Sequence, residues 1–291
     1  MFRLGWALCV PLLWPWSIAA AEGAIRIVAA ENFYGDVAVQ LAGPGAQVVS
    51  VLRNPNADPH LFEADTATAR AISAADLVIY NGLNYDPWMV KLLASARSSR
   101  RRVIEAAAVL HRDVPGTNPH LWYDPMSMPA VARATAAELQ QIDPPHQSLY
   151  AQRLQQFLAS GGQIDAAIDR LRDHYAGTLV AATEPVAQYM TAAIGLVMSN
   201  QRFQLAVMND TEPSASDTAA FEQALRSRKT RVLIYNKQVI NPAVQRLVAI
   251  ARESHVPLVA VTETEPPGMN YQQWMLGQLQ ALERALAGEP P

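Results

Sequence analysis

The sequence predicts an α/β protein with two lobes, each built on a mostly parallel sheet and joined to the other by one long helix. Helical patterns alternate with short apolar, β-branched runs, and the spacing is too wide for a succession of hairpins. Strands that alternate with helices are typical of βα units, which build parallel sheets. The candidate strands are residues 25–29, 47–51, 77–80, 103–104, 178–182, 204–207, 232–235 and 258–262.

A strand-free segment at residues 147–175 predicts the connecting helix. A helix of this length rises about 1.5 Å per residue and reaches roughly 40 Å. Pro144 and Pro145 suit its start, whereas Gly161 and Gly162 each disfavour helix by about 1 kcal/mol and permit a kink. The alternative is a long surface helix within a single domain. The apolar residues that repeat at helical spacing are Tyr150, Leu154, Phe157, Leu158, Ile164, Ile168, Leu171 and Tyr175.

The first 21 residues have the pattern of a signal peptide. Arg3 supplies a positive start, residues 4–18 are apolar, and small residues at 19–21 offer a cleavage site. A membrane anchor is the alternative, but Pro11 and Pro15 interrupt the run, which is short for a bilayer span of about 20 residues. The sequence therefore predicts export to the periplasm with cleavage of this segment.

The rest of the chain divides into an N-terminal lobe at residues 22–143, the connecting helix at 144–176 and a C-terminal lobe at 177–291. A length of 291 residues fits two domains, at roughly 100–200 residues per domain.

Composition and charge exclude several classes of function. The chain has 23 basic and 26 acidic residues and a formal net charge of −3, which leaves no electrostatic footprint for nucleic acid. Its single cysteine, Cys9, lies in the predicted signal peptide, so disulfides, cysteine-ligated zinc and thiol catalysis are not expected. We expect a monomer that binds no nucleic acid.

Two of the six histidines lie in matching local sequences. Residues 58–62 and 118–122 both read Asx-Pro-His-Leu-aromatic, which places His60 and His120 directly after a proline. Because proline restricts the backbone and Asp or Asn bonds nearby backbone groups, such a turn holds an imidazole rigidly, as a metal ligand requires. The repetition favours ligation over the alternative of two unrelated turn histidines.

Four nearby polar residues are candidates for supporting the ligands, namely Asn32, Asp58, Glu63 and Asn118. A carboxylate or carbonyl oxygen on the second ring nitrogen of a ligating histidine would fix its tautomer. The alternative for each is a turn residue that bonds only its local backbone.

The C-terminal half contributes two glutamates at predicted strand ends. Residues 179–184 and 258–263 both run from an apolar strand into Thr-Glu, and they end in Glu184 and Glu263. Ligands of open α/β sheets bind at the carboxyl ends of strands, and a glutamate in a crevice is costly to desolvate unless it is paired or bound to metal. Glu265 is the weaker alternative to Glu263. A solvated glutamate, or one at a helix N-terminus, is the other interpretation.

His60, His120, Glu184 and Glu263 together predict a four-ligand site for one divalent transition metal. Two neutral imidazoles and two carboxylates carry a charge of about −2, which matches a divalent cation. Calcium and magnesium would not recruit histidine, and the chain lacks the thiolates that favour copper(I). Zinc and manganese are the expected cargo.

The sequence resembles the periplasmic solute-binding proteins of zinc and manganese ABC importers, the cluster A-I or TroA-like family. The resemblance rests on residues 30–34, 58–60, 75–83 and 118–122, followed by the long helix. It implies two α/β lobes joined by a rigid helix, with the metal between them.

The resemblance also implies roles for the four candidate ligands. His60 and His120 match the ligands of the N-terminal lobe. Glu184 stands where many zinc binders have histidine and many manganese binders have glutamate, and Glu263 stands where aspartate is usual.

The predicted function is capture of zinc or manganese in the periplasm and delivery to an ABC permease at the inner membrane, with no catalytic residue. A metallohydrolase that uses the same ligands is one alternative, and it would need an open coordination position and a general base. A siderophore- or cobalamin-type binding protein is another, and it would need an aromatic or basic crevice. A surface adhesin is a further alternative.

Overall fold

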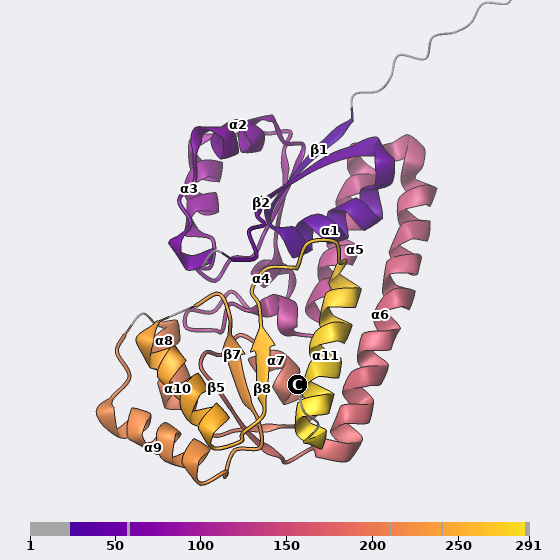
Figure 1. Cartoon of the computed structure of the whole chain (residues 1–291). Helices are drawn as coiled ribbons and strands as arrows, with labels where there is room; N and C mark the ends of the chain where they lie inside the picture. Colours follow the sequence, from indigo (N-terminus) through magenta and orange to yellow (C-terminus); the bar gives the residue numbers. More distant parts are fainter. Residues whose placement is uncertain (1–23, 57–58, 210, 240, 289–291) are drawn as a thin grey trace, which may run out of the picture.

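The computed structural model describes residues 24–56, 59–209, 211–239 and 241–288, and of His60 it describes the backbone alone. Within these ranges the chain forms two four-stranded parallel sheets, with the orders β2-β1-β3-β4 and β6-β5-β7-β8 (Figure 1). The two sheets have corresponding topologies, and the predicted fold class is confirmed. The strands are β1 (Ile25–Glu31), β2 (Ala46–Leu52), β3 (Leu77–Tyr80), β4 (Arg102–Glu105), β5 (Leu179–Ala182), β6 (Val197–Met198), β7 (Leu233–Asn236) and β8 (Leu258–Val261).

Helices connect these strands and cover the sheets. Those of the N-terminal lobe are α1 (Asn32–Ala42), α2 (Thr66–Ala74), α3 (Pro87–Ser95), α4 (Ala106–Val109) and α5 (Ser127–Ile142). The connector is α6 (Gln147–Tyr175), and the C-terminal lobe has α7 (Gln188–Ile194), α8 (Gln201–Met208), α9 (Ala215–Arg226), α10 (Pro242–Glu253) and α11 (Tyr271–Ala287). The short 3₁₀ turns are η1 (Gly43–Gly45), η2 (Pro59–Leu61), η3 (Leu121–Tyr123) and η4 (Pro144–His146).

The N-terminal sheet is covered on both faces. Strand β3 is a continuous apolar run, and all four of its residues are buried, as expected for a parallel strand between two helical layers. Ile27 and Ile79 join the core that includes α1 and α5. Val28 and Val78 face a second cluster formed with α2 and α3.

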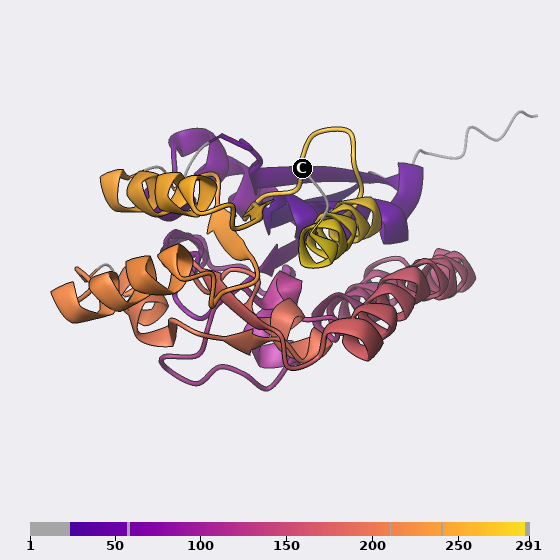
Figure 2. The same ribbon diagram turned by 60° about the horizontal axis from the view of Figure 1, so that its bottom comes forward.

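Helix α6 runs the length of both lobes and shows no break at Gly161 and Gly162 (Figures 1 and 2). Arg153 on this helix donates to the carbonyl oxygen of Ala42 at 2.6 Å in the N-terminal lobe. Arg172 donates to the carbonyl oxygen of Ala193 at 2.8 Å in the C-terminal lobe. The helix is therefore bonded to both lobes. The proposed boundaries at residues 143–144 and 176–177 stay a prediction.

The C-terminal helix α11 lies alongside α6 (Figures 1 and 2). Its Gln272 donates to the hydroxyl of Ser160 on α6 at 2.9 Å and to Gln40 on α1 at 3.1 Å. Helix α11 thus bonds to the connecting helix and to the N-terminal lobe.

One strand prediction was wrong. Residues 204–207 lie in helix α8, and the strand that follows β5 along the chain and pairs with it is the two-residue β6. Phe203 and Val207 are four residues apart, so they share one face of a helix, and the Phe203 ring packs on Phe221 with centroids 5.1 Å apart. A short apolar run cannot distinguish a strand from a buried helix segment by periodicity alone.

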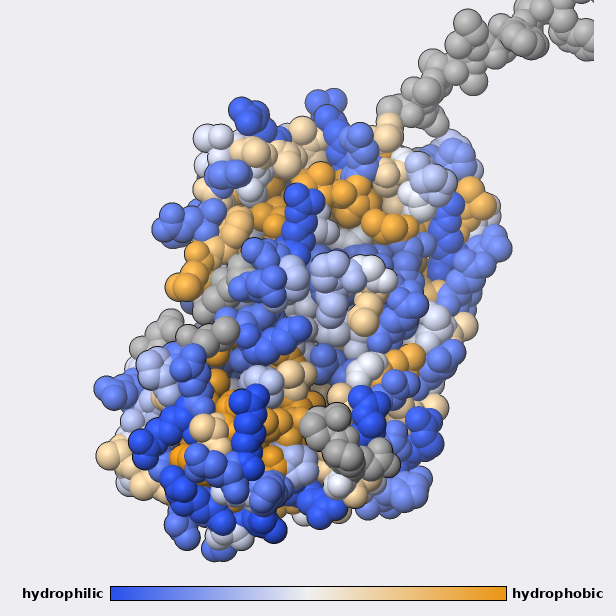
Figure 3. Space-filling view, viewed as in Figure 1, coloured by the Kyte–Doolittle hydropathy of each residue, from blue (hydrophilic) through white to orange (hydrophobic). Residues whose placement is uncertain are grey.

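The predicted signal peptide lies outside the described residues. In the part of the chain that the structure describes, no helix combines the length and the apolar character needed to cross a membrane. The face shown in Figure 3 mixes hydrophilic and hydrophobic residues over both lobes.

Candidate metal site

His120 is held in a rigid turn of the N-terminal lobe. Leu121 and Trp122, which follow it in η3, are fully buried, and the His120 side chain is 2% exposed. The side-chain oxygen of Asn118 accepts from the backbone N–H of His120 at 3.1 Å and lies 2.6 Å from ring atom Nδ1. This contact assigns the proton to Nδ1, so that Nε2 carries the lone pair for a metal. Asn118 therefore orients the His120 ring, and its role in supporting a metal ligand stays a prediction.

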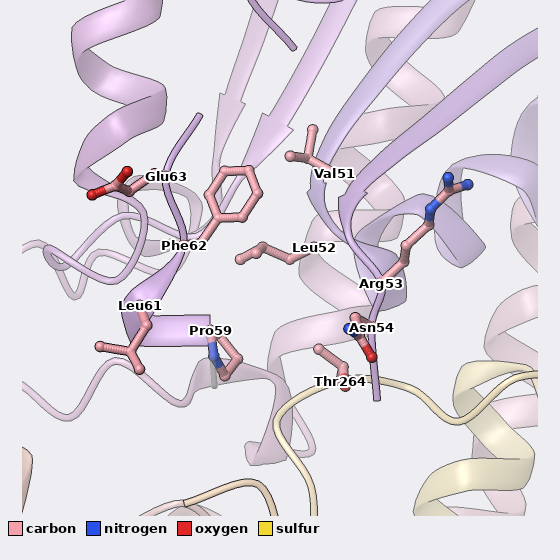
Figure 4. A pocket seen from close by; sticks show the side chains of 9 residues that line it. All are labelled: Val51, Leu52, Arg53, Asn54, Pro59, Leu61, Phe62, Glu63 and Thr264. Atoms are coloured by element: carbon pink, nitrogen blue, oxygen red, sulfur yellow. The ribbon is translucent and has the colours of Figure 1, made fainter. Parts of the chain in front are cut away.

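His60 lies in the matching turn, η2. The structure does not describe its side chain. The turn adjoins a cavity of about 610 Å³ lined by the end of β2, by residues 59 and 61–63, and by Thr264 (Figure 4). Glu63 is exposed, and Figure 4 shows its carboxylate directed away from Leu52 and Thr264. Asp58 lies outside the described residues. The ligand role of His60 therefore stays a prediction.

Glu184 and Glu263 come from the ends of β5 and β8. Strand β7 pairs with both of these strands in parallel, so all three carboxyl ends lie at one edge of the sheet. Glu263 is fully buried and Glu184 is 8% exposed. Oε2 of Glu263 lies 3.4 Å from Nε2 of His120. This contact joins a predicted ligand of one lobe to a predicted ligand of the other.

Asn236, the last residue of β7, was missed by the sequence analysis. Its amide nitrogen donates to Oε2 of Glu184 at 2.9 Å and to Oε1 of Glu263 at 2.6 Å. A single buried amide thus bridges both carboxylates. No motif marked Asn236, because its position depends on β7 lying between β5 and β8.

Tyr85 is a second residue that the sequence analysis missed. Its hydroxyl donates across the lobes to Oε2 of Glu263 at 3.0 Å. Burial, followed by the nearby charges of Glu263 and Glu31, raises the pKa of Tyr85 well above its ordinary value, so the phenol stays a neutral donor. A clue in the sequence is the preceding Asn81-Gly82-Leu83 segment. There Gly82 has φ +82°, a conformation that favours glycine.

A buried acidic pair supports the turn that carries Tyr85. The carboxylate of Asp86 accepts from the backbone N–H of Asn81 at 2.6 Å and of Gly82 at 2.9 Å, while burial raises the pKa of Asp86 to about 7. Glu31, at the end of β1, is fully buried. Burial, followed by the charge of Asp86, raises the pKa of Glu31 well above its ordinary value. Folding therefore favours the protonated form of Glu31.

Glu265 has a different role from Glu263. The side chain of Asn32 donates to the carbonyl oxygen of Glu265 at 2.7 Å and accepts from its backbone N–H at 3.0 Å. Asn32 thus joins the two lobes through the backbone of Glu265, and its support of a metal ligand stays a prediction. These contacts favour Glu263 over Glu265 as the carboxylate facing His120.

The structure therefore brings His120, Glu184 and Glu263 together around Asn236 and Tyr85. Among the side chains it describes, which do not include that of His60, no three His, Cys, Asp or Glu residues form a group ready to hold a metal ion. The donor types nonetheless suit a divalent transition metal, since imidazole and carboxylate both bind such ions.

Two parallel-sheet lobes, a long connecting helix and polar side chains converging between the lobes define a two-lobe binding protein. The sequence model of the family described as "Zinc-uptake complex component A periplasmic" (ZnuA) matches residues 27–285. The chain belongs to this family of metal-binding periplasmic substrate-binding proteins of ABC metal importers.

Individual relatives agree with this assignment. The chain is 24% identical over 247 residues to the zinc-binding protein TroA of Treponema pallidum, covering 82% of this chain and 79% of that protein. It is 21% identical over 291 residues to the manganese ABC transporter substrate-binding lipoprotein PsaA of Streptococcus mitis, covering 92% and 91%. The solved structure of the periplasmic zinc-binding protein TroA from T. pallidum superposes with a TM-score of 0.75 at 19% identity, covering 89% of this chain and 98% of that one.

Proposed function

We propose that this chain binds one divalent transition-metal ion between its lobes, through His60, His120, Glu184 and Glu263, and delivers it to an ABC permease. The observation that carries the proposal is the buried contact between Nε2 of His120 and Oε2 of Glu263, 3.4 Å apart and contributed by different lobes. Family membership supports the delivery step.

The surroundings of His120 support its role as a ligand. Asn118 fixes the ring through Nδ1, and the side-chain amide of Asn118 donates to the carbonyl oxygen of Pro185, one residue after Glu184. The orientation of the imidazole is therefore coupled to the strand end that carries the second lobe's glutamate. Such support of a ligating histidine is typical of metal sites.

We propose that the protein works in the periplasm as a monomeric carrier and not as an enzyme. The names of the relatives include zinc-binding and manganese-transporting proteins, and both metals fit the donor set here. A metallohydrolase would need an open coordination position, whereas four protein ligands would complete a tetrahedral shell around zinc.

Metal analysis of the purified full-length chain tests the proposal. After loading with zinc and exhaustive dialysis, we expect about one zinc ion per chain, because the four predicted donors form one site. Loss of all bound metal on dialysis would contradict the proposal. Metal-dependent hydrolysis of esters or phosphoesters by the loaded protein would favour the hydrolase alternative.

A further inference from the structure

Asn236 is fixed in one orientation between the two predicted carboxylate ligands. Its side-chain oxygen accepts from the backbone N–H of Gln238 at 3.0 Å, and its own backbone N–H donates to the hydroxyl of Thr183 at 3.3 Å. Asn236 is 2% exposed. A flipped amide would turn its oxygen towards two carboxylates and leave the Gln238 N–H facing a donor, so the nitrogen must face the glutamates.

The two hydrogens of this amide are divided between the glutamates. One goes to Oε2 of Glu184 at 2.9 Å and the other to Oε1 of Glu263 at 2.6 Å. The other oxygen of Glu263, Oε2, lies 3.4 Å from Nε2 of His120 and accepts from the Tyr85 hydroxyl at 3.0 Å. Asn236 thus engages the Glu263 oxygen other than the one that faces the imidazole.

The backbone around Glu263 reinforces this arrangement. The side-chain oxygen of Gln238 accepts from the backbone N–H of Glu263 at 2.6 Å. The side-chain amide of Gln238 also donates to the hydroxyl of Thr264 at 3.0 Å. The turn after β8 is therefore anchored to the turn after β7, and the carboxylate of Glu263 cannot rotate away from Asn236 without breaking buried hydrogen bonds.

We infer that Asn236 is a specificity-determining positioning residue, which holds one oxygen of each glutamate so that the metal receives a single oxygen from each. This inference rests on the proposed metal-binding function. Single-oxygen contacts from two glutamates and two imidazoles give four ligand atoms, the tetrahedron that zinc prefers. Two-oxygen contacts would give five or six ligand atoms and suit manganese better. Asn236 therefore favours zinc over manganese.

The test replaces Asn236 by leucine, which has a similar size and no donor, and by serine, which keeps one donor. Zinc and manganese affinities are measured by competition titration on the full chain. We expect the zinc-to-manganese affinity ratio to fall about tenfold in Asn236→Leu, equivalent to about 1.4 kcal/mol, and by less in Asn236→Ser. In the leucine variant, visible absorption of bound cobalt(II) should weaken as its coordination number rises above four.

Gln204→Leu is the matched control, since it removes another buried amide of the same lobe, which donates to the side-chain oxygen of Asn200 at 3.0 Å. This control should keep the wild-type ratio and cobalt spectrum. An unchanged ratio and spectrum in Asn236→Leu and Asn236→Ser, with metal still bound, would overturn the inference and leave the proposed function intact. Failure of the wild-type chain to bind either metal would instead overturn the proposed function.

Discussion

The two lobes use the same sheet topology but position their predicted ligand side chains in different ways. In the N-terminal lobe His120 lies in a turn beyond the sheet, and Leu121 and Trp122 anchor that turn in the core. In the C-terminal lobe Glu184 and Glu263 directly follow the Thr residues at the strand ends. One lobe thus positions an imidazole by local turn structure, and the other positions carboxylates by the pairing of its strands.

The difference determines what holds each group in place. The orientation of His120 depends on Asn118, two residues away in the chain. The orientation of both glutamates depends on Asn236, which is 52 residues from Glu184 and 27 residues from Glu263. A local motif therefore orients His120, whereas contacts between distant parts of the chain orient Glu184 and Glu263.

The largest effect is expected when a predicted histidine ligand is removed. His60→Ala and His120→Ala should each weaken zinc binding on the order of 100-fold or more, because each removes a predicted ligand from a set of four. The protein without metal should stay folded, since the core is built from other residues. Calorimetric titration with zinc measures the affinity, and circular dichroism measures folding.

His174→Ala is the control for these variants, because His174 is an exposed histidine in the last turn of α6. Its affinity should equal that of the wild type. Wild-type affinity in His60→Ala or in His120→Ala would remove that residue from the ligand set.

The second largest effect is expected when a predicted carboxylate ligand is replaced by an imidazole. Glu184→His should raise the zinc-to-manganese affinity ratio about tenfold, because three imidazoles and one carboxylate suit zinc better than manganese. Glu184 and His120 both line a cavity of about 680 Å³, which leaves room for the ring. Competition titration measures the ratio.

Glu265→Ala provides the comparison for this experiment. Its backbone bonds to Asn32 do not require the side chain, so the ratio should stay at the wild-type value. A zinc-to-manganese affinity ratio that falls in Glu184→His would contradict the ligand assignment. So would a ratio that changes more in Glu265→Ala than in Glu184→His.

A smaller effect concerns the buried acidic pair of the N-terminal lobe, Glu31 and Asp86. The pKa of Glu31 is raised in the folded protein by burial and by Asp86, so folding favours the protonated form. Its contribution to stability is present at low pH and is lost as pH rises through the folded pKa. Glu31→Gln stays neutral and should gain stability relative to the wild type in that upper range, by up to about 1.4 kcal/mol per pH unit.

Urea unfolding of the metal-free wild type and of Glu31→Gln at pH 5 and pH 9 measures this difference. The difference in unfolding free energy should be larger at pH 9 than at pH 5. A difference that is equal at both values would show that Glu31 has an ordinary pKa.

The smallest effect concerns the helix that joins the lobes. Gly162→Ala should raise the free energy of unfolding by about 1 kcal/mol, because alanine is the better helix former and, among the described residues, no heavy atom beyond the chain neighbours and the adjacent backbone of the helix lies within 4 Å of the added Cβ. Gly195→Ala should destabilise the protein, since Gly195 has φ +80° and its Cβ would lie 3.3 Å from Ala176 Cβ. Thermal unfolding measures both, and a destabilising Gly162→Ala would imply that the helix is not continuous there.

The sequence predicted the fold well because both sheets are parallel and their strands are separated by clear helical patterns. Seven of the eight candidate strands overlap observed strands, and the failure at residues 204–207 came from an apolar run too short to show its period. The His120 turn could be predicted because its supporting residue is local. Asn236 could not, because the order of the strands brings it to Glu263. For Tyr85 the preceding Asn81-Gly82-Leu83 segment was a clue, but its contact with Glu263 depends on the packing of the lobes.

X-ray absorption spectroscopy of the zinc-loaded protein tests the central claim most directly, because it counts the ligand atoms around the metal and the imidazole rings among them. We predict two imidazole nitrogens and two carboxylate oxygens at about 2.0–2.2 Å from zinc. Scattering from two imidazole rings, within a shell of four nitrogen or oxygen atoms, would agree with His60, His120, Glu184 and Glu263 as the ligands. A shell with fewer than two imidazoles, or one made of oxygens alone, would contradict the account.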